Sequence, residues 1–425
     1  MSDRFTSEQR AAIDAQGKTI VSASAGSGKT TVMIEKIIRL IKSGVRVEDI
    51  LAVTFTKKAA SSFVNLLTHP TSYHVVKRAT ISTKMAMIIR LSTIVVALLV
   101  CSLLAALMIG ANPFEFIRSL FFGVFGSSGR IWSFAKGTAV LLMISLAITP
   151  AFKMRFWNIG AEGQTLIGAL ASVAMIQIFQ DTIPNGWLLI LMLIASVVAS
   201  GVWAGLPAVF KALFNTNETL FTLMMNYIAT GLVAYFLLVW TPDGSSVLGM
   251  LNFGHFPIVG HKYLLTVVAA LIMTIFVYIY LKYSKQGYEI SVVGESENTA
   301  KYIGINVGKV IIRTMIISGI LCGIAGFILV GAVDHSVSET TVGGLGFTAI
   351  MASWLAKFNP FIMIGSAAFI TFLDQGSAEI TTAFNIDSAF PDIVVGIVLF
   401  FIIGCEFFIN YRIKQRDIKK EVADK

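Results

Sequence analysis

The sequence has 425 residues, of which 56% are hydrophobic and only 13% are charged, and its mean hydropathy is +0.78. In soluble globular domains about a quarter of the residues are usually charged, so a single water-soluble domain is excluded. The composition, with 31 Phe, 16 Met and 35 Gly, is typical of a helical protein that crosses a membrane several times. The three cysteines lack disulfide or metal-ligand spacing, and no metal site is expected.

The chain changes character near residue 66. Residues 1–66 read as soluble sequence, residues 67–84 form a junction, and apolar runs of membrane length recur through residues 85–425. We therefore expect a short soluble segment followed by a transmembrane domain. The first apolar run begins too late for a secretory signal peptide, so the first span is expected to act as the insertion signal.

The soluble segment contains a phosphate-binding loop. The stretch Ala23-Ser-Ala-Gly-Ser-Gly-Lys-Thr30 lies between a short strand pattern and a helical pattern, which is the arrangement of a P-loop. Backbone N–H groups of such a turn bind phosphates, Lys29 would neutralise their charge, and Thr30 would hold magnesium. The pattern predicts a short α/β fragment with ATP and Mg²⁺ as possible ligands.

This loop, together with Gln9 and the stretch Leu51-Ala-Val-Thr-Phe-Thr-Lys-Lys-Ala-Ala60, resembles the start of a superfamily 1 helicase. The closest likeness is to the helicase chain of the ATP-dependent helicase–nuclease that processes double-strand breaks. The resemblance implies that Gln9 reads adenine and that the second stretch touches single-stranded DNA. The nucleotide-binding residues that it implies are Gln9, Gly26, Gly28, Lys29 and Thr30.

The helicase resemblance stops at about residue 62. The Asp-Glu pair, the arginine finger and the second RecA-like lobe of that family do not follow in the sequence. Hydrolysis of ATP needs these groups, and about 60 residues are too few for a RecA-like core. We interpret residues 1–66 as a truncated fragment, left by gene rearrangement or by an assembly or gene-calling error. A membrane-tethered DNA-dependent ATPase and a regulatory nucleotide-sensing extension remain the alternatives.

The remainder of the chain is expected to be an all-α polytopic membrane domain of about ten transmembrane helices. The two segments at 344–357 and 360–375 are shorter than the roughly 20 residues of a full crossing, which predicts half-helices or a broken pair. The expected spans are 87–111, 132–151, 159–180, 187–206, 217–240, 263–282, 310–333, 344–357, 360–375 and 390–410.

Loop charges predict the orientation of these spans. Lys and Arg gather in alternate loops and at the C-terminal end, where Arg412 to Lys420 is expected to contact the inner leaflet. The positive-inside rule then places both ends of the chain in the cytoplasm of a plasma-membrane protein. The opposite set of loops, which includes 334–341 and 376–389, is expected outside. Arg118 and Arg130 are the weak point, because both fall in an outer loop.

Two polar clusters mark the predicted spans. The first, Phe156 to Gln164, includes Asn158, Glu162 and Gln164, and a carboxylate there needs a partner or water. These residues are expected either to border the transport path or to fix a helix break. The second cluster is Thr216 to Tyr227. Helix capping is favoured for Asn217, and a place on the transport path is favoured for Asn226.

The third cluster is a long inner loop, residues 288–306. Its pattern predicts a short amphipathic helix from Ser296 to Tyr302, ended by Gly304. A compact cytoplasmic helix between spans can dock into another protein, whereas spacing alone favours a solvated connector.

Together, the three clusters resemble the permeases of ABC importers for branched-chain amino acids, simple sugars and nucleosides, and the nucleoside branch most of all. The resemblance covers about residues 73–425. Trp157 and the bulky residues before Phe358 depart from the family pattern and bear on substrate identity. The motifs that carry it are 156–164, 217–229, 293–306, 343–347, 358–360 and 390–396.

The resemblance implies a permease subunit that performs no chemistry and needs no cofactor of its own. Its implied partners are a separate ABC ATPase, a second permease, an extracellular substrate-binding lipoprotein, a nucleoside or related solute, and membrane lipids. No nucleic-acid partner is expected. The loop that contacts the ATPase in this family corresponds here to Gly294, Glu295, Ala300, Tyr302 and Gly304.

Overall fold

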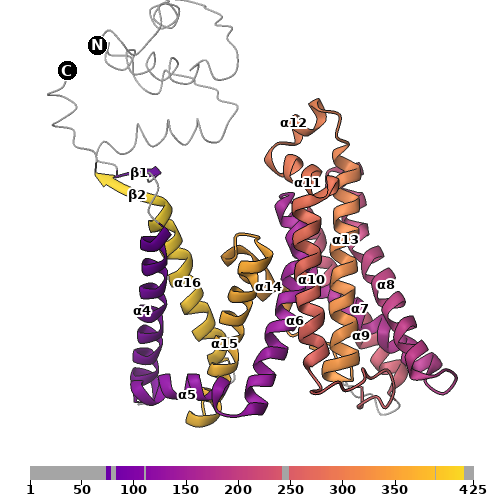
Figure 1. Ribbon diagram of the computed structural model, residues 1–425, viewed down its shortest axis with the longest axis horizontal. Coiled ribbons are helices and arrows are strands. Elements are labelled where there is room, and N and C mark those ends of the chain that lie inside the picture. The colour runs from indigo at the N-terminus through magenta and orange to yellow at the C-terminus, as the bar shows by residue number, and fades with distance from the viewer. Residues whose placement is uncertain (1–72, 78–82, 110–111, 242–247, 388, 416–425) are drawn as a thin grey trace, which may run out of the picture. The chain divides into compact units, whose positions relative to one another are not determined.

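The computed structural model describes residues 73–77, 83–109, 112–241, 248–387 and 389–415 (Figure 1). The predicted nucleotide-binding residues Gln9, Gly26, Gly28, Lys29 and Thr30 lie outside the described residues. The chain divides into two compact units. One comprises Met1–Ile94 with Phe401–Lys425, and the other comprises Val95–Phe400.

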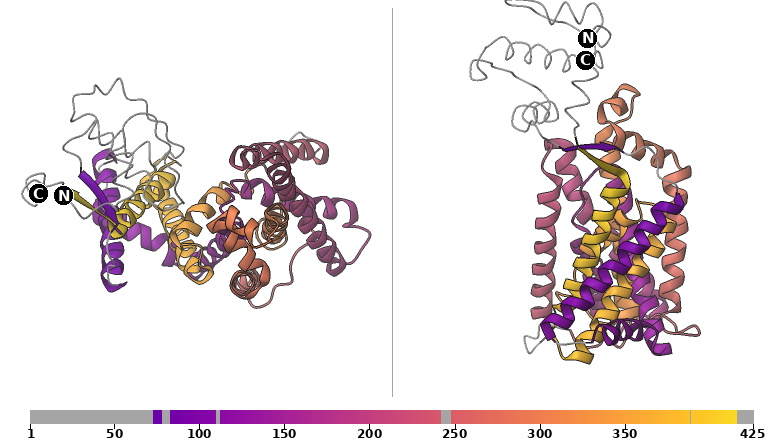
Figure 2. Two further views of the ribbon diagram at one scale, coloured as in Figure 1. Left: turned by 90° about the horizontal axis from the view of Figure 1, so that it is seen from above. Right: turned by 90° about the vertical axis from the view of Figure 1, so that its left-hand side faces the viewer.

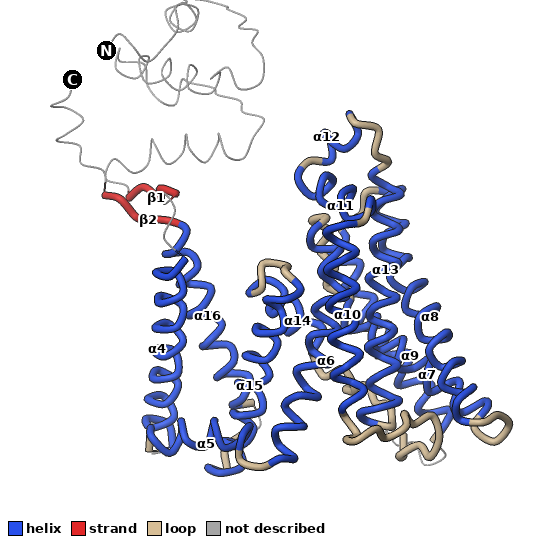
Figure 3. The backbone as a smooth tube through the Cα atoms, viewed as in Figure 1, coloured by secondary structure: helices blue, strands red, loops and turns tan. Residues whose placement is uncertain are grey.

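The first unit contains a two-stranded antiparallel sheet, which the sequence did not predict (Figure 3). Strand β1 (Tyr73–Lys77) pairs with β2 (Tyr411–Gln415), with Tyr73 opposite Gln415. The unit also holds the start of α4 (Thr83–Ile109) and the end of α16 (Phe390–Asn410). Ile89 of α4 packs there against Cys405 and Ile409 of α16.

The second unit is a bundle of helices (Figure 2). Besides parts of α4 and α16, it comprises α5 (Pro113–Phe125), α6 (Ser128–Lys153), α7 (Ala161–Phe179), α8 (Asn185–Phe214), α9 (Glu218–Trp240), α10 (Leu264–Tyr283), α11 (Lys285–Glu295), α12 (Glu297–Tyr302), α13 (Val307–Ile328), the π-helix η2 (Leu329–Asp334), α14 (Leu345–Leu355) and α15 (Pro360–Phe384).

The predicted apolar segments reappear as helices in the same order. Among the described residues, eight helices are long and apolar enough to cross a membrane: α4, α6, α7, α8, α9, α10, α13 with η2, and α15. Two further apolar helices are shorter, α14 and the stretch Phe390–Ile402 of α16. The prediction of an all-α polytopic membrane protein is confirmed, and the segment at 344–357 forms a short apolar helix of 11 residues.

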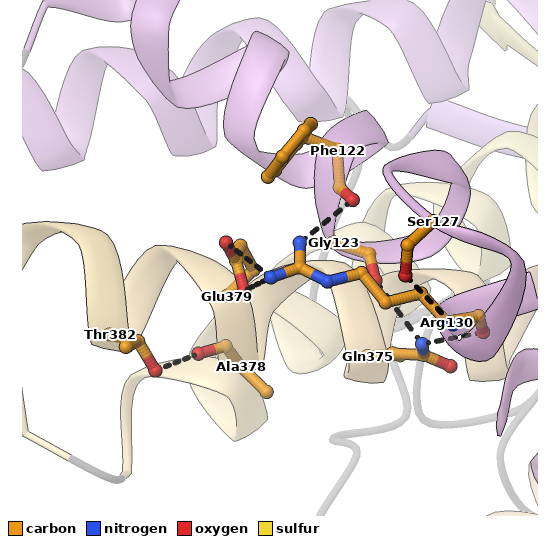
Figure 4. Close-up of polar contacts among 8 residues, drawn as sticks. All are labelled: Phe122, Gly123, Ser127, Arg130, Gln375, Ala378, Glu379 and Thr382. Carbon is orange, nitrogen blue, oxygen red and sulfur yellow. Dashed lines mark hydrogen bonds and ion pairs between the residues drawn. The ribbon is translucent and has the colours of Figure 1, made fainter.

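Two predicted spans were too short, and the first, at 187–206, lies within α8, which has 30 residues. The sequence indicated a short segment at 360–375 followed by an outer loop, but α15 continues to Phe384 and has 25 residues. The apolar run stops at Leu373 because Asp374 and Gln375 follow it, and further along α15 the Glu379 carboxylate pairs with Arg130 at 2.9 Å (Figure 4). Since the Glu379 charge has a partner, α15 can carry a carboxylate beyond the end of the predicted span.

Helix α5 occupies part of what the sequence indicated as an outer loop. Asn112 caps it by accepting a hydrogen bond from the Phe114 N–H, and Pro113 stands at its first turn, where a missing N–H costs nothing. In Figure 1, α5 lies across the direction of the longer helices α6 and α15. It packs against α15 through glycine: a Cβ on Gly123 would lie 2.7 Å from the Glu379 Cβ.

Small residues bring α7, α8 and α13 together at the centre of the second unit. A Cβ on Gly319 of α13 would lie 2.4 Å from the Ser200 carbonyl oxygen of α8, so only glycine permits this approach. One turn along, the Ser196 hydroxyl donates a hydrogen bond to the Gly323 carbonyl at 2.6 Å. Helices packed this closely through small residues and hydroxyls are typical of membrane proteins.

Candidate functional site

The backbone between α6 and α7 is held by a reciprocal pair of amide side chains. Asn158 is fully buried, and its Oδ1 accepts hydrogen bonds from the Gly160 N–H at 3.0 Å and from Gln164 Nε2 at 3.1 Å. Its Nδ2 lies 3.3 Å from Gln164 Oε1 and 3.4 Å from the Ser318 hydroxyl of α13. Two of the predicted site residues therefore lie together and fix the helix break.

Asn226 of α9 also binds the backbone at the start of α7. Its Nδ2 donates to the Ile159 carbonyl at 3.0 Å, and its Oδ1 accepts from the Gly163 N–H at 2.9 Å. Asn226 is 6% exposed, so its amide serves the backbone of α7 in this conformation. Its predicted place on the transport path stays a prediction. Asn217 caps α9 through the N–H groups of its first turn, and capping is the role favoured from the sequence.

Glu162 joins the first turn of α7 to the N-terminus of α14. Its Oε1 accepts a hydrogen bond from the Gly344 N–H and its Oε2 from the Gly346 N–H, each at 2.7 Å. We call Glu162, Gly344 and Gly346 the Glu162 clamp. The expectation that this carboxylate needs a partner is confirmed. The partners were missed, although the glycine-rich stretch before a short apolar segment was the signal for them.

The predicted inner loop folds as two helices, α11 and α12. The Ser296 hydroxyl caps α12 by accepting from the Thr299 N–H at 3.2 Å, and Gly304 follows with a φ of +83°. The short helix and its glycine end are therefore as predicted, whereas α11 was not foreseen. Ala300 is buried, while Tyr302 is 90% exposed.

Helix α11 is anchored to the ends of two long helices. A Cβ on Gly294 would lie 2.1 Å from the Lys153 carbonyl oxygen, so α11 touches the last turn of α6. Glu289 pairs with Arg313 of α13 at 2.8 Å. Glu295 is exposed at the end of α11, and α12 projects beyond it (Figure 1). Of the predicted coupling residues, Gly294 and Ala300 are buried, whereas Glu295, Tyr302 and Gly304 are exposed.

The described residues hold no group of three or more His, Cys, Asp or Glu side chains that could bind a metal ion. The polar groups that do gather are amides, a carboxylate and backbone N–H groups around the start of α7. These groups hold backbone segments in place through hydrogen bonds, and they do not form a nucleophile–base arrangement.

A family model for the permease component of branched-chain amino acid transport systems matches residues 130–403, which is more than half of the chain. The chain belongs to this permease family. It is therefore a membrane transport protein rather than an enzyme. A second model, for the N-terminal domain of UvrD/REP helicases, matches residues 5–90.

Relatives agree with both matches. A glucose ABC transporter permease of Haloferax volcanii is 26% identical over 341 residues, covering 74% of this chain and 88% of the relative. A guanosine ABC transporter permease of Bacillus subtilis is 27% identical over 331 residues, covering 74% and 94%. An ATP-dependent helicase/nuclease chain of Lactobacillus acidophilus is 59% identical over only 58 residues, 13% of this chain and 5% of that protein. Both resemblances seen in the sequence are confirmed.

Proposed function

We propose that this chain is the membrane-spanning permease subunit of a nucleoside importer driven by a separate ABC ATPase. Support for the substrate class comes from the guanosine permease of Bacillus subtilis, which matches over 94% of its own length. The glucose permease of Haloferax volcanii makes a simple sugar the nearest alternative solute. The partners in this proposal are the ATPase, a second permease and an extracellular substrate-binding lipoprotein.

The observation that carries the proposal is that α12 is exposed while the adjoining α11 is packed against α6 and α13. Tyr302 is 90% exposed, while Ala300 and Gly294 of the same connection are buried. A solvated connector would not need a buried glycine against the end of α6 or an ion pair to α13. A rigid, protruding helix can bind another protein and transmit that protein's movement to the membrane-spanning helices.

In this mechanism the ATPase pair closes on ATP and moves α11 and α12. The spans then alternate between outward-open and inward-open arrangements around the solute. The spans are in equilibrium between these two arrangements, which differ in their affinity for the closed ATPase. ATP binding by the ATPase therefore shifts the equilibrium toward the arrangement that binds the closed ATPase more tightly. The positive-inside pattern supports an orientation with α12 and both chain ends in the cytoplasm.

A linker replacement tests this proposal. We expect that exchanging residues 295–302 for a Gly-Ser linker of equal length abolishes guanosine uptake and copurification of the ATPase, without removing the chain from the membrane. Tyr302→Ala should weaken both. Tyr235→Ala is the matched control, since Tyr235 is 60% exposed on α9. Normal uptake with the linker would refute the coupling role.

A second candidate function is a membrane-tethered, DNA-dependent ATPase that binds ATP and Mg²⁺. It is favoured only by the 58-residue match at the start of the chain. DNA-stimulated hydrolysis by the purified full chain, abolished by Lys29→Ala, would support it. We expect Lys29→Ala to leave guanosine uptake unchanged, because the rest of the helicase machinery does not follow in the sequence.

A further inference from the structure

Two helices of the second unit meet at their N-termini, and one carboxylate joins them. Glu162 stands in the first turn of α7, and both of its oxygens accept hydrogen bonds from the start of α14. The first N–H groups of a helix lack partners within that helix, and the helix dipole favours a negative charge beside them. Glu162 therefore supplies to α14 the cap that its own sequence lacks, since Gly344 has no side chain.

The local backbone is shaped for this contact. A Cβ on Gly346 would lie 2.4 Å from the Glu162 nitrogen and 2.8 Å from its Oε2, so a side chain there would push the two helices apart. Gly343 and Gly344 have φ values of +59° and +81°, which L-residues with side chains rarely adopt. Three glycines and one carboxylate thus combine to hold α14 against α7.

The start of α7 is also tied to two other helices. Asn226 connects it to α9 through Gly163, and the Asn158–Gln164 amide pair connects it to α13 through Ser318. A movement of these residues relative to their neighbours would break several hydrogen bonds in a region that water does not reach. The start of α7 is therefore expected to move as one body with the amides around it.

The segment that joins α6 to α7, residues 154–160, begins next to the point where α11 contacts α6. Gly294 of α11 contacts the Lys153 carbonyl, and Lys153 is the last residue of α6. Residues 154–160 then lead directly to α7, and the Phe156 N–H bonds back to the Ala151 carbonyl at 3.0 Å. Contacts run without interruption from α11, through the end of α6 and the start of α7, to α14.

We propose that Glu162 is a positioning residue of the transport cycle. It transmits movement of residues 154–160, which join α6 to α7, to the short helix α14. This inference rests on the proposed function, because the movement begins with the ATPase at α11 and α12. Both carboxylate oxygens hold backbone N–H groups, so in this conformation Glu162 acts on α14 rather than on the solute. The role requires α14 to follow α7 between the two states of the permease.

The test compares transport with ATP consumption in proteoliposomes that contain the full chain, the second permease, the ATPase and the binding protein. Radiolabelled guanosine is the probe, and the readout is guanosine moved per ATP hydrolysed. Glu162→Gln keeps the size but loses the charge, and Glu162→Asp keeps the charge but is one methylene too short to span both amides. Glu339→Gln is the matched control, since Glu339 is exposed in the described structure.

We expect Glu162→Gln to lower the ratio about tenfold while ATP hydrolysis continues, Glu162→Asp to give an intermediate value, and the control to match the original chain. A merely structural role would reduce the amount of folded protein and leave the ratio per ATP unchanged, which would overturn the inference. If Glu162→Gln does not fold, the ratio of Glu162→Asp decides in the same way. If the original chain itself moves no guanosine with hydrolysis, the proposed function fails and the inference fails with it.

Discussion

Arg130 and Glu379, which lie 249 residues apart in the sequence, form an ion pair in which Arg130 Nη2 is 3.0 Å from Oε1 and 2.9 Å from Oε2. The same guanidinium donates from Nη1 to the Phe122 carbonyl at 2.9 Å and lies 4.7 Å from the Phe122 ring centre (Figure 4). Gln375 adds hydrogen bonds to the carbonyls of Gly123 and Arg130. The pair joins α5, α6 and α15, and it neutralises one of the two arginines that weakened the charge pattern of the loops.

A double-mutant cycle measures the worth of this pair. The side chains are 33% and 23% exposed, so we expect a coupling energy of at most about 1 kcal/mol between Arg130→Ala and Glu379→Ala. Arg130→Ala should destabilise more than Glu379→Ala, because it also removes the bond to Phe122. Thermal unfolding in detergent is the measurement. Equal effects of the two single variants would contradict this assignment of contacts.

Gly294 should not tolerate a side chain. A Cβ there would lie 2.1 Å from the Lys153 carbonyl oxygen, so Gly294→Ala is expected to displace α11 from the end of α6. The expected result is a loss of ATPase stimulation by the chain. Gly231→Ala is the control, because a Cβ on Gly231 would meet no atom of the described residues within 4 Å. Similar effects of both substitutions would show that the close contact at Gly294 is unimportant.

The contact between His335, which follows η2, and the loop before α10 is expected to lose stability in acid. The rings of His255 and His335 stack with centres 4.0 Å apart, and the Leu251 N–H donates to the His335 carbonyl at 2.9 Å. Burial, with His255 and Lys262 nearby, lowers the pKa of His335 from its ordinary value of 6.5. The folded chain thus favours the neutral ring, so the contribution to stability is complete above about pH 6.5 and is lost as pH falls through the lower folded-state pKa.

His335→Asn should flatten this pH dependence. Asn is the suitable replacement because residue 335 has a φ of +51°, which Asn tolerates better than most residues. The measurement is the midpoint of thermal unfolding at pH 5 and at pH 8 for both chains. An equally large shift in His335→Asn would assign the pH dependence to another group.

The order of the spans could be predicted because each apolar run has a membrane length of its own. The helix at 297–302 was also predictable, since Ser296 and Gly304 mark its ends by local chemistry. Residue 379 shows the limit: it was placed in an outer loop, and only its pairing with the distant Arg130 shows how α15 can carry a carboxylate there. Hydropathy contains no information about partners in another part of the sequence.

The candidate site was predicted as a set of residues but not as an arrangement. Asn158, Glu162, Gln164 and Asn226 were identified because polar side chains among apolar ones need partners. Their actual partners are mostly backbone groups, which no residue type reveals. The role of Gly346 was equally hidden, because the need for a missing side chain appears only when Glu162 is in place.

Cysteine labelling from the two sides of the membrane tests the orientation. With the single new cysteine Tyr302→Cys, a membrane-impermeant maleimide is expected to react only after the cells are opened. Glu339→Cys should react in intact cells, because the loop at 334–341 is expected outside. Both positions are exposed, and Cys101, Cys322 and Cys405 are buried and should contribute little background. The reverse pattern would invert the orientation.

The central claim, that the chain is a nucleoside permease, is tested most directly by guanosine uptake in a permease-null host. The full chain would be expressed with the second permease, the ATPase and the binding protein, and a chain with the 295–302 linker would serve as the matched negative. We predict ATP-dependent uptake above the empty-vector level for the full chain and none for the linker variant. Absence of uptake by the full chain, while it is present in the membrane with its ATPase bound, would contradict the account.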